Sequence, residues 1–264
     1  LDRQDALALE PKVSEEVRGA LFTTEGGHVN AERLTLALTQ AAARKGARVL
    51  QGKAVVGFVV EGSRVVGVRL PDETWPADHV VVAAGAWTAE AVRWLGVDLP
   101  IVPVRGQILA LRALPKPVQR IVFGPRGYLV PRVDGTITVG ATMEWVGFHR
   151  AVTVRGLASL LDVAAGLVPA LHDAEVVRVW AGLRPGSSDQ LPILGPLPGW
   201  DGVSVASGHF RNGILLGPLT GQVVAEMVLG KAPSVPVEPF SPARFHGTGS
   251  AAREPAPRGD LASR

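Results

Sequence analysis

Cysteine is absent from the 264 residues of this chain. Disulfide bonds, thiolate metal sites, iron–sulfur clusters and cysteinyl-linked cofactors are therefore excluded. No apolar run reaches the roughly 18 residues that a membrane-spanning helix needs, and the first residues do not resemble a signal peptide. Because a chain without cysteine fits a reducing compartment, we expect a cytoplasmic protein with no membrane partner.

Excess charge is also scarce. The 27 Lys and Arg residues against 24 Asp and Glu residues leave a formal charge of +3, and the arginines are scattered along the chain. Nucleic-acid binding needs a basic block or stripe, so we expect no nucleic-acid partner. No two of the six histidines have a metal-ligand spacing, and we predict no metal site.

Over the first hundred residues, the hydrophobic spacing predicts helices and strands in alternation. Apolar residues recur at helical spacing from Asn30, a suitable N-cap, to Gly46, a suitable stop. Glu61-Gly62 predicts a hairpin turn. Residues 79–85 are apolar on both faces, which is typical of a strand buried in a parallel sheet. The predicted elements are a helix over 31–45, strands at 47–50, 54–60, 65–70 and 79–85, and a helix at 86–95.

From residue 101 the pattern changes to short alternating strands separated by Pro and Gly, which favours an antiparallel sheet. The predicted elements are strands at 103–111, 119–123, 128–132 and 136–139, a helix at 154–168, strands at 174–183 and 203–206, and a helix at 213–229. Residues 247–264 are rich in Pro, Ser, Ala and Arg, which predicts a disordered tail.

Together these elements predict a mixed α/β fold with two domains interleaved in sequence. Residues 1–27 and 101–184 are expected to form an antiparallel-sheet domain. Residues 28–100 and 185–240 are expected to form a Rossmann-like nucleotide-binding domain. The parallel strands come from separated pieces of the chain, so the two domains are not consecutive.

Three segments carry residues suited to ligand chemistry. Arg184 closes a predicted strand, where a guanidinium can hold a carboxylate through two hydrogen bonds or form a structural ion pair. Tyr128, the only tyrosine, is either a ligand contact or a packed residue. The third segment joins a strand to a helix, whose first N–H groups favour negative charge. The segments are WAGLRPGSSD at 180–189, GHFRNGILLGP at 208–218 and GYLVPR at 127–132.

Together these segments resemble the glycine oxidase branch of the FAD-dependent D-amino-acid oxidase family, the kind found in bacterial thiamine biosynthesis. The resemblance extends over residues 1–245, and the segments keep the family's order and approximate spacing. It implies FAD as the cofactor, an FAD-binding role for the Rossmann-like domain and a substrate-binding role for the antiparallel-sheet domain. It also implies oxidative deamination of glycine or a small amino acid or amine, with release of hydrogen peroxide. Sarcosine oxidase-like and D-amino-acid dehydrogenase-like activities are the alternatives.

The resemblance also assigns roles to individual residues. Arg184 is expected to clamp the substrate carboxylate, Tyr128 to face the same group, and Arg211 to add positive charge nearby. Arg126 stands where relatives can have histidine, which leaves the polarity of the substrate pocket open. No side chain is assigned as a catalytic base, because the flavin itself carries the chemistry. The residues expected to contact FAD are Val55, Ala84, Gly85, His209, Phe210, Arg211, Asn212, Gly213, Ile214 and Leu215.

The Gly-x-Gly-x-x-Gly turn that holds the pyrophosphate in this family occurs nowhere in the chain. The FAD-binding domain is therefore expected to be incomplete, with Leu1 matching the family downstream of that turn. This leaves two hypotheses. In the first, the chain is an oxidase fragment whose full-length form, or complex with a complementing N-terminal chain, oxidises glycine or small D-amino acids. A homo-oligomer is the alternative to the complementing chain. In the second, it is a flavin-free remnant that acts as a binding module.

Overall fold

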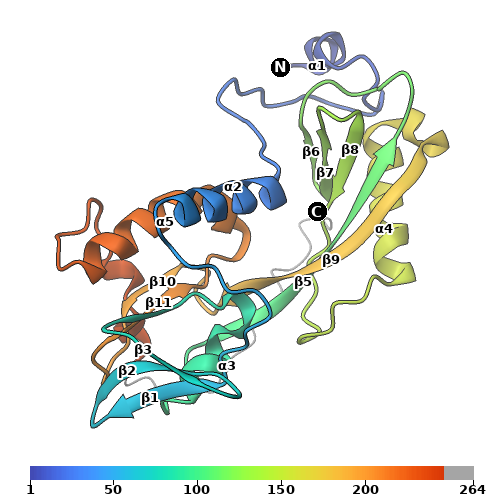
Figure 1. The fold of residues 1–264 in the computed structure, drawn as a ribbon. Helices are drawn as coiled ribbons and strands as arrows, with labels where there is room; N and C mark the ends of the chain where they lie inside the picture. Colours follow the sequence, from blue (N-terminus) through green and yellow to red (C-terminus); the bar gives the residue numbers. More distant parts are fainter. Residues whose placement is uncertain (247–264) are drawn as a thin grey trace. The chain divides into compact units, whose positions relative to one another are not determined.

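The structure is a computed structural model that describes residues 1–246 (Figure 1). Its α-helices are α1 (Arg3–Leu9), α2 (Ala31–Arg44), α3 (Thr88–Arg93), α4 (Val154–Leu167) and α5 (Gly213–Val228). Short 3-10 helices are η1 (Gly85–Trp87), η2 (Pro169–Asp173), η3 (Phe210–Asn212), η4 (Glu238–Phe240) and η5 (Pro242–Phe245). None of the helices within these residues combines the length and hydropathy needed to cross a bilayer.

The strands form three sheets. β1 (Gly57–Glu61), β2 (Arg64–Arg69) and β3 (Thr74–Pro76) pair in that order. A second sheet has the order β10 (Ile193–Pro196), β11 (Val203–Ser207), β4 (Val80–Val82). The third has the order β6 (Val122–Gly124), β7 (Gly127–Pro131), β8 (Thr136–Gly140), β5 (Ile101–Arg112), β9 (Glu175–Ser187).

The chain divides into two compact units, each built from separated segments. Among the described residues, unit 1 contains residues 1–30 and 105–183, and unit 2 contains residues 31–104 and 184–246. The boundaries fall inside β5 and β9, so each of these two strands has one end in each unit. The roles predicted for the two domains, substrate binding and FAD binding, stay proposals.

Unit 1 is an antiparallel sheet with a helix on it. α4 lies against β6, β7 and β8 (Figure 1). Thr153 caps α4 by accepting a hydrogen bond from the Gly156 N–H at 3.2 Å. Alternate residues of the strands point toward the helix, so one face of the sheet and one face of α4 are buried together. This core contains Leu109, Leu111, Leu129, Ile137, Val139, Leu160, Val163 and Ala164.

Unit 2 places a parallel strand pair in its core. β4 and β11 run parallel with Val82 opposite Val205, and β10 joins β11 on the other side in the antiparallel sense. α5 lies beside β10 (Figure 1). The side chains buried here include Val65, Val82, Val92, Ile101, Ile193, Val203 and Val205.

The mixed α/β fold class is confirmed, and most predicted elements are present. The hairpin turn at Glu61-Gly62 is confirmed, with Glu61 paired to Arg64 and Gly62 at φ +59°. Short elements were missed: α1, β3 and β10. Because α1 spans only 7 residues and β3 and β10 span 3 and 4, they are too short to establish a hydrophobic period. The predicted disordered tail at 247–264 lies outside the described residues.

Two predicted strands are corrected. Residues 47–50 are not a strand, and Val49 and Leu50 are exposed. A run of apolar residues forms a strand only where a neighbouring backbone pairs with it. The strand predicted at 79–85 is reduced to Val80–Val82, and Val81 is 37% exposed, so it is not buried on both faces. In the part of the chain that the structure describes, β4 stands at one end of its sheet, which leaves it less covered than a central strand.

Candidate functional site

The candidate site is built at the carboxyl edge of the parallel pair β4 and β11. The parallel pairing ends with Val82 opposite Val205, so residues 83–85 and residues 206–208, which are the end of β11 and the glycine after it, follow at the same edge. The Ser207 hydroxyl donates a hydrogen bond to the Gly85 carbonyl at 3.0 Å and ties the two exits together. In open α/β sheets ligands bind at this edge. The structure thus brings the predicted residues Ala84 and Gly85 next to the turn at 208–212.

The end of β9 reaches the same turn. Gly186 pairs with His209 through an isolated antiparallel bridge. The Phe210 ring lies 3.7 Å from the position that a Cβ on Gly186 would occupy. Arg184 is half-buried and lies two residues before Gly186 in β9. The bridge from Gly186 therefore sets Arg184 near the predicted flavin-facing turn. Sequence positions 184 and 209 are distant, and the strand bridge brings their segments together.

Helix α5 begins at this turn with its first N–H groups uncapped by a side chain. Asn212 is the N-cap residue but its side chain makes no capping hydrogen bond. Arg211, Asn212, Ile214 and Leu215 are exposed. The start of a helix carries unpaired N–H donors and the positive end of the helix dipole, which favour an anionic group.

His209 is held in place inside the turn. Its Nε2 lies 2.9 Å from the Thr220 hydroxyl of α5. Burial lowers the pKa of His209 below its ordinary value, because the charged imidazolium loses its hydration there. The ring is therefore neutral near pH 7. The positively charged side chain of this turn is therefore that of Arg211, which is exposed.

A groove of about 290 Å³ lies between α5 and the two parallel strands. A Cβ placed on Gly217 or Gly221 would meet nothing within 4 Å, so the helix leaves open space there. The groove is too small for a whole dinucleotide. It suits the close approach of a flat ring or of another backbone. Its lining residues are Val81, Ala83, Ala206, His209, Gly213, Gly217, Thr220, Gly221 and Val224.

Two further predicted site residues, Tyr128 and Val55, do not belong to β4, β9, β11 or α5. Tyr128 belongs to β7 of unit 1, where its half-buried ring lies over Gly140 of β8 and packs against the Phe123 ring, with the two ring centroids 5.4 Å apart. A Cβ on Gly140 would collide with that ring, so the glycine makes room for it. Val55 is 45% exposed and precedes β1, which belongs to a different sheet from β4 and β11.

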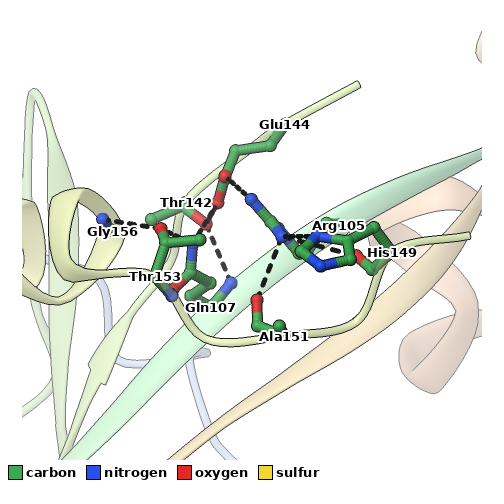
Figure 2. Close-up of polar contacts among 8 residues, drawn as sticks. All are labelled: Arg105, Gln107, Thr142, Glu144, His149, Ala151, Thr153 and Gly156. Carbon is green, nitrogen blue, oxygen red and sulfur yellow. Dashed lines mark hydrogen bonds and ion pairs between the residues drawn. The ribbon is translucent and has the colours of Figure 1, made fainter. Parts of the chain in front are cut away.

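A buried polar cluster in unit 1 fixes the segment that follows β8 (Figure 2). Arg105 of β5 forms an ion pair with Glu144 and donates to the Ala151 carbonyl at 3.0 Å and to His149 Nδ1 at 2.8 Å. The Gln107 amide donates a hydrogen bond to the Glu144 carboxylate at 2.7 Å and accepts one from the Thr153 N–H at 2.8 Å. Both β5 side chains are almost fully buried. They therefore pin the loop between β8 and α4 onto the sheet.

Glu144 is stabilised as a carboxylate by this cluster. Partial burial raises the pKa of Glu144, but hydrogen bonds from Arg105, Thr142 and Gln107 outweigh it, and the net pKa is lowered. Sequence reasoning did not single out these residues. Arg105, Gln107 and Glu144 carry no local motif, and only the pairing of Arg105 with Glu144 across the sheet brings them together.

Comparisons with known proteins agree with the resemblance. Residues 1–227 match the family described as FAD dependent oxidoreductase (DAO). The chain belongs to the FAD-dependent oxidoreductase family. Within this family it is 39% identical to a glycine oxidase of Geobacillus kaustophilus over 249 residues, covering 94% of this chain and 66% of that protein. It is 38% identical to the bifunctional protein ThiO/ThiG of Synechocystis over 250 residues, covering 93% of this chain and 37% of that protein.

Solved structures of family members have the same fold. The crystal structure of glycine oxidase from Geobacillus kaustophilus superposes with a TM-score of 0.88 and covers 92% of this chain and 66% of that chain. Iminodiacetate oxidase from Chelativorans sp. BNC1, 31% identical, superposes with a TM-score of 0.86, covering 92% and 66%. This member of the FAD-dependent oxidoreductase family thus spans between about a third and two thirds of the length of these relatives.

Proposed function

We propose that this chain supplies the substrate clamp and the flavin-facing turn of a glycine oxidase-type enzyme, which deaminates glycine or a small amino acid. The observation that carries the proposal is the bridge between Gly186 and His209. It sets the strand end that carries Arg184 beside the uncapped start of α5. The similarity to glycine oxidase and to ThiO/ThiG supports the substrate class and a role in thiamine biosynthesis.

The residues of unit 2 fit part of an FAD molecule. The uncapped N–H groups at Gly213 and Ile214 suit the flavin edge that gains negative charge on reduction. The carboxyl edge of β4 and β11 suits the close approach of a dinucleotide. Bound there, FAD would supply the two-electron oxidation of the substrate at its α-carbon, with oxygen as the final electron acceptor and hydrogen peroxide as the product. The imino acid that remains hydrolyses to a 2-oxo acid and ammonia.

In this proposal the chain's own residues bind and orient the substrate. The planar guanidinium of Arg184 holds the carboxylate through two parallel hydrogen bonds, and Tyr128 contacts the same group. Arg211 adds positive charge at the turn. None of these side chains removes a proton from the α-carbon, so binding energy is used for orientation.

Replacement of Arg184 tests the clamp. In an active enzyme Arg184→Ala should raise KM for glycine, because the lost charge-assisted contact costs about 2–4 kcal/mol of binding. Arg184→Lys keeps the charge but loses the two-pronged geometry, and should recover only part of the loss. Steady-state peroxide release measures both variants. An unchanged kcat/KM in Arg184→Ala would remove this residue from the site.

We also propose that a further polypeptide segment docks on unit 2 and supplies the pyrophosphate contact. Among the strands of residues 1–246, β4 is paired only with β11. Helix α2 has no buried residue, although its apolar residues lie on one face. The groove beside Gly217 and Gly221 leaves room for a closely packed helix or strand. Unpaired strand edges and apolar helix faces are normally covered.

Complementation tests the docking proposal. The chain would be co-expressed with the third of Geobacillus kaustophilus glycine oxidase that the similarity does not cover, and the complex purified with FAD. We expect co-purification and a retained flavin absorbance band that bleaches anaerobically with glycine. Gly217→Leu should abolish both, because its side chain fills the groove, whereas Gly182→Leu on exposed β9 should not. Equal flavin retention by Gly217→Leu would contradict the proposal.

The flavin-free binding module is the second candidate. The same samples separate the two candidates. Flavin that is never retained, with or without the added segment, would support the binding module and reject the oxidase. Gel filtration of the chain alone measures any homo-oligomer. Peroxide release on glycine, sarcosine and D-alanine ranks the glycine oxidase-like, sarcosine oxidase-like and D-amino-acid-specific activities.

A further inference from the structure

Arg244, on the short helix η5 near the end of the described chain, reaches back to the loop between β9 and β10. Its Nε and Nη2 donate to the two carboxylate oxygens of Asp189 at 2.7 and 3.2 Å. Nη1 donates to the carbonyls of Phe240 and Ser241, and Nη2 to those of Leu191 and Pro192. All three guanidinium nitrogens are engaged, which fixes the side chain in one geometry.

From Asp189 the contacts continue toward the candidate site. The Leu191 N–H donates to Asp189 at 3.0 Å, and the Leu191 carbonyl accepts from the buried Ser187 hydroxyl at 2.7 Å. Ser187 also lies 3.4 Å from the Gly208 carbonyl. A Cβ on Gly208 would lie 3.4 Å from the Leu191 carbonyl and 3.0 Å from the Ile193 side chain. The loop therefore packs directly against the first residue of the flavin-facing turn.

The turn needs such support because its backbone is strained. Gly208 has φ +75°, which glycine adopts readily, but Phe210 has φ +50°. A side chain with a Cβ is disfavoured in this left-handed region, because the Cβ comes too close to the following carbonyl oxygen. Such conformations persist only where the surrounding structure holds them. The loop at 188–192 is one of the structures that packs on this turn.

We propose that Arg244 is a positioning residue that holds the His209–Asn212 turn, and with it the start of α5, through Asp189 and Leu191. The inference rests on the proposed function for its catalytic consequence, but the geometry of the turn can be measured without it. The contacts of Arg244 with Asp189 and Leu191 thus form a latch on a turn that is distant from Arg244 in the sequence.

The charge state of Asp189 agrees with this latch. Partial burial raises the pKa of Asp189, but hydrogen bonds from Arg244 and from the Leu191 N–H lower the pKa by more than burial raises it. The net pKa therefore lies below its usual value. The carboxylate is therefore ionised throughout the neutral range. A surface pair with similar chemistry is Arg93 with Asp98 at 3.2 Å, in the same unit but with both side chains about 60% exposed.

Amide hydrogen exchange of the chain tests the latch directly. In Arg244→Met, exchange at residues 208–213 should rise about tenfold or more, while the β1–β2 hairpin at 57–69 keeps its protection. Arg244→Lys should give a smaller rise, because the ammonium keeps the charge but loses the fork. Arg93→Met is the matched control and should change neither region. Unchanged exchange at 208–213 in Arg244→Met, or equal loss of protection at 57–69, would overturn the proposal.

Kinetics of the complemented enzyme then separate positioning from substrate binding. Arg244→Lys should lower kcat with little change in KM for glycine, whereas Arg184→Ala raises KM. If the unsubstituted enzyme releases no peroxide, the proposed function fails, and the exchange result still decides whether the latch exists. A matching rise of KM in Arg244→Lys would overturn a positioning role at the turn.

Discussion

At the scale of single residues, buried charge in unit 1 is stabilised by several partners at once. Arg105 is 3% exposed and contacts Glu144, His149 and Ala151. Removing one member of a buried ion pair leaves the other without compensation. In unit 2, removing Arg244 would likewise leave Asp189 without its charged partner, although both of these side chains are more exposed to water than Arg105.

Arg105→Met should therefore destabilise the fold. We expect a loss of about 3 kcal/mol, at the lower end for a broken buried pair, because a quarter of the Glu144 side chain stays exposed. Urea denaturation measures the change. Arg93→Met, which breaks the exposed pair with Asp98, should cost only about 0–1 kcal/mol. Equal losses in the two variants would show that the cluster contributes no more than a surface pair.

At the scale of elements, neighbouring strands place Tyr128. Residue 128 of β7 lies opposite residue 140 of β8, and the tyrosine ring occupies the space that any side chain at 140 would need. This kind of cross-strand packing depends on the register of the pair. Glycine at 140 is thus required by the neighbour and not by a turn.

Gly140→Ala should displace the tyrosine ring. Overpacking of this kind costs about 1–3 kcal/mol of stability. Because the chain has one tyrosine, ring labelling gives one set of NMR signals, which should shift or broaden. Gly182→Ala, where a Cβ meets nothing within 4 Å, is the control and should leave the signals in place. Unshifted tyrosine signals in Gly140→Ala would contradict the packing.

At the scale of the whole molecule, two half-buried histidines make stability depend on pH. Burial lowers the pKa of His79, with Arg64 adding to the effect, and burial lowers the pKa of His209. The unfolded chain then takes up these protons before the folded chain does. Above the ordinary histidine pKa of about 6.5, these two histidines do not change the free energy of unfolding. As the pH drops below that value, the free energy of unfolding falls.

The double variant His79→Gln/His209→Gln tests this dependence. Between about pH 7 and pH 5 the midpoint of urea unfolding should fall more steeply in the unsubstituted chain than in the double variant. The comparison is confined to this range because Glu144 and Asp189 lose their own contributions only at lower pH. Parallel pH profiles would mean that neither histidine contributes.

The sequence by itself determined the family, the mixed fold class and the candidate residues. The WAGLRP and GHFRNG segments are local strings, so they can be recognised without a structure. Long periodic elements such as α4 and α5 were predicted for the same reason, since their pattern is contained within them. The cytoplasmic location and the roles of Arg184, Tyr128 and Val55 stay predictions.

Only the tertiary structure decided which distant residues meet. The bridge between Gly186 and His209, the cluster around Arg105 and the reach of Arg244 to Asp189 each join positions that are far apart in sequence. No local pattern encodes such contacts, because they depend on strand register and on how loops return to the sheet. The same reason explains the incorrect strand at 47–50: its apolar residues suit a strand, but pairing requires a partner that only the folded chain supplies.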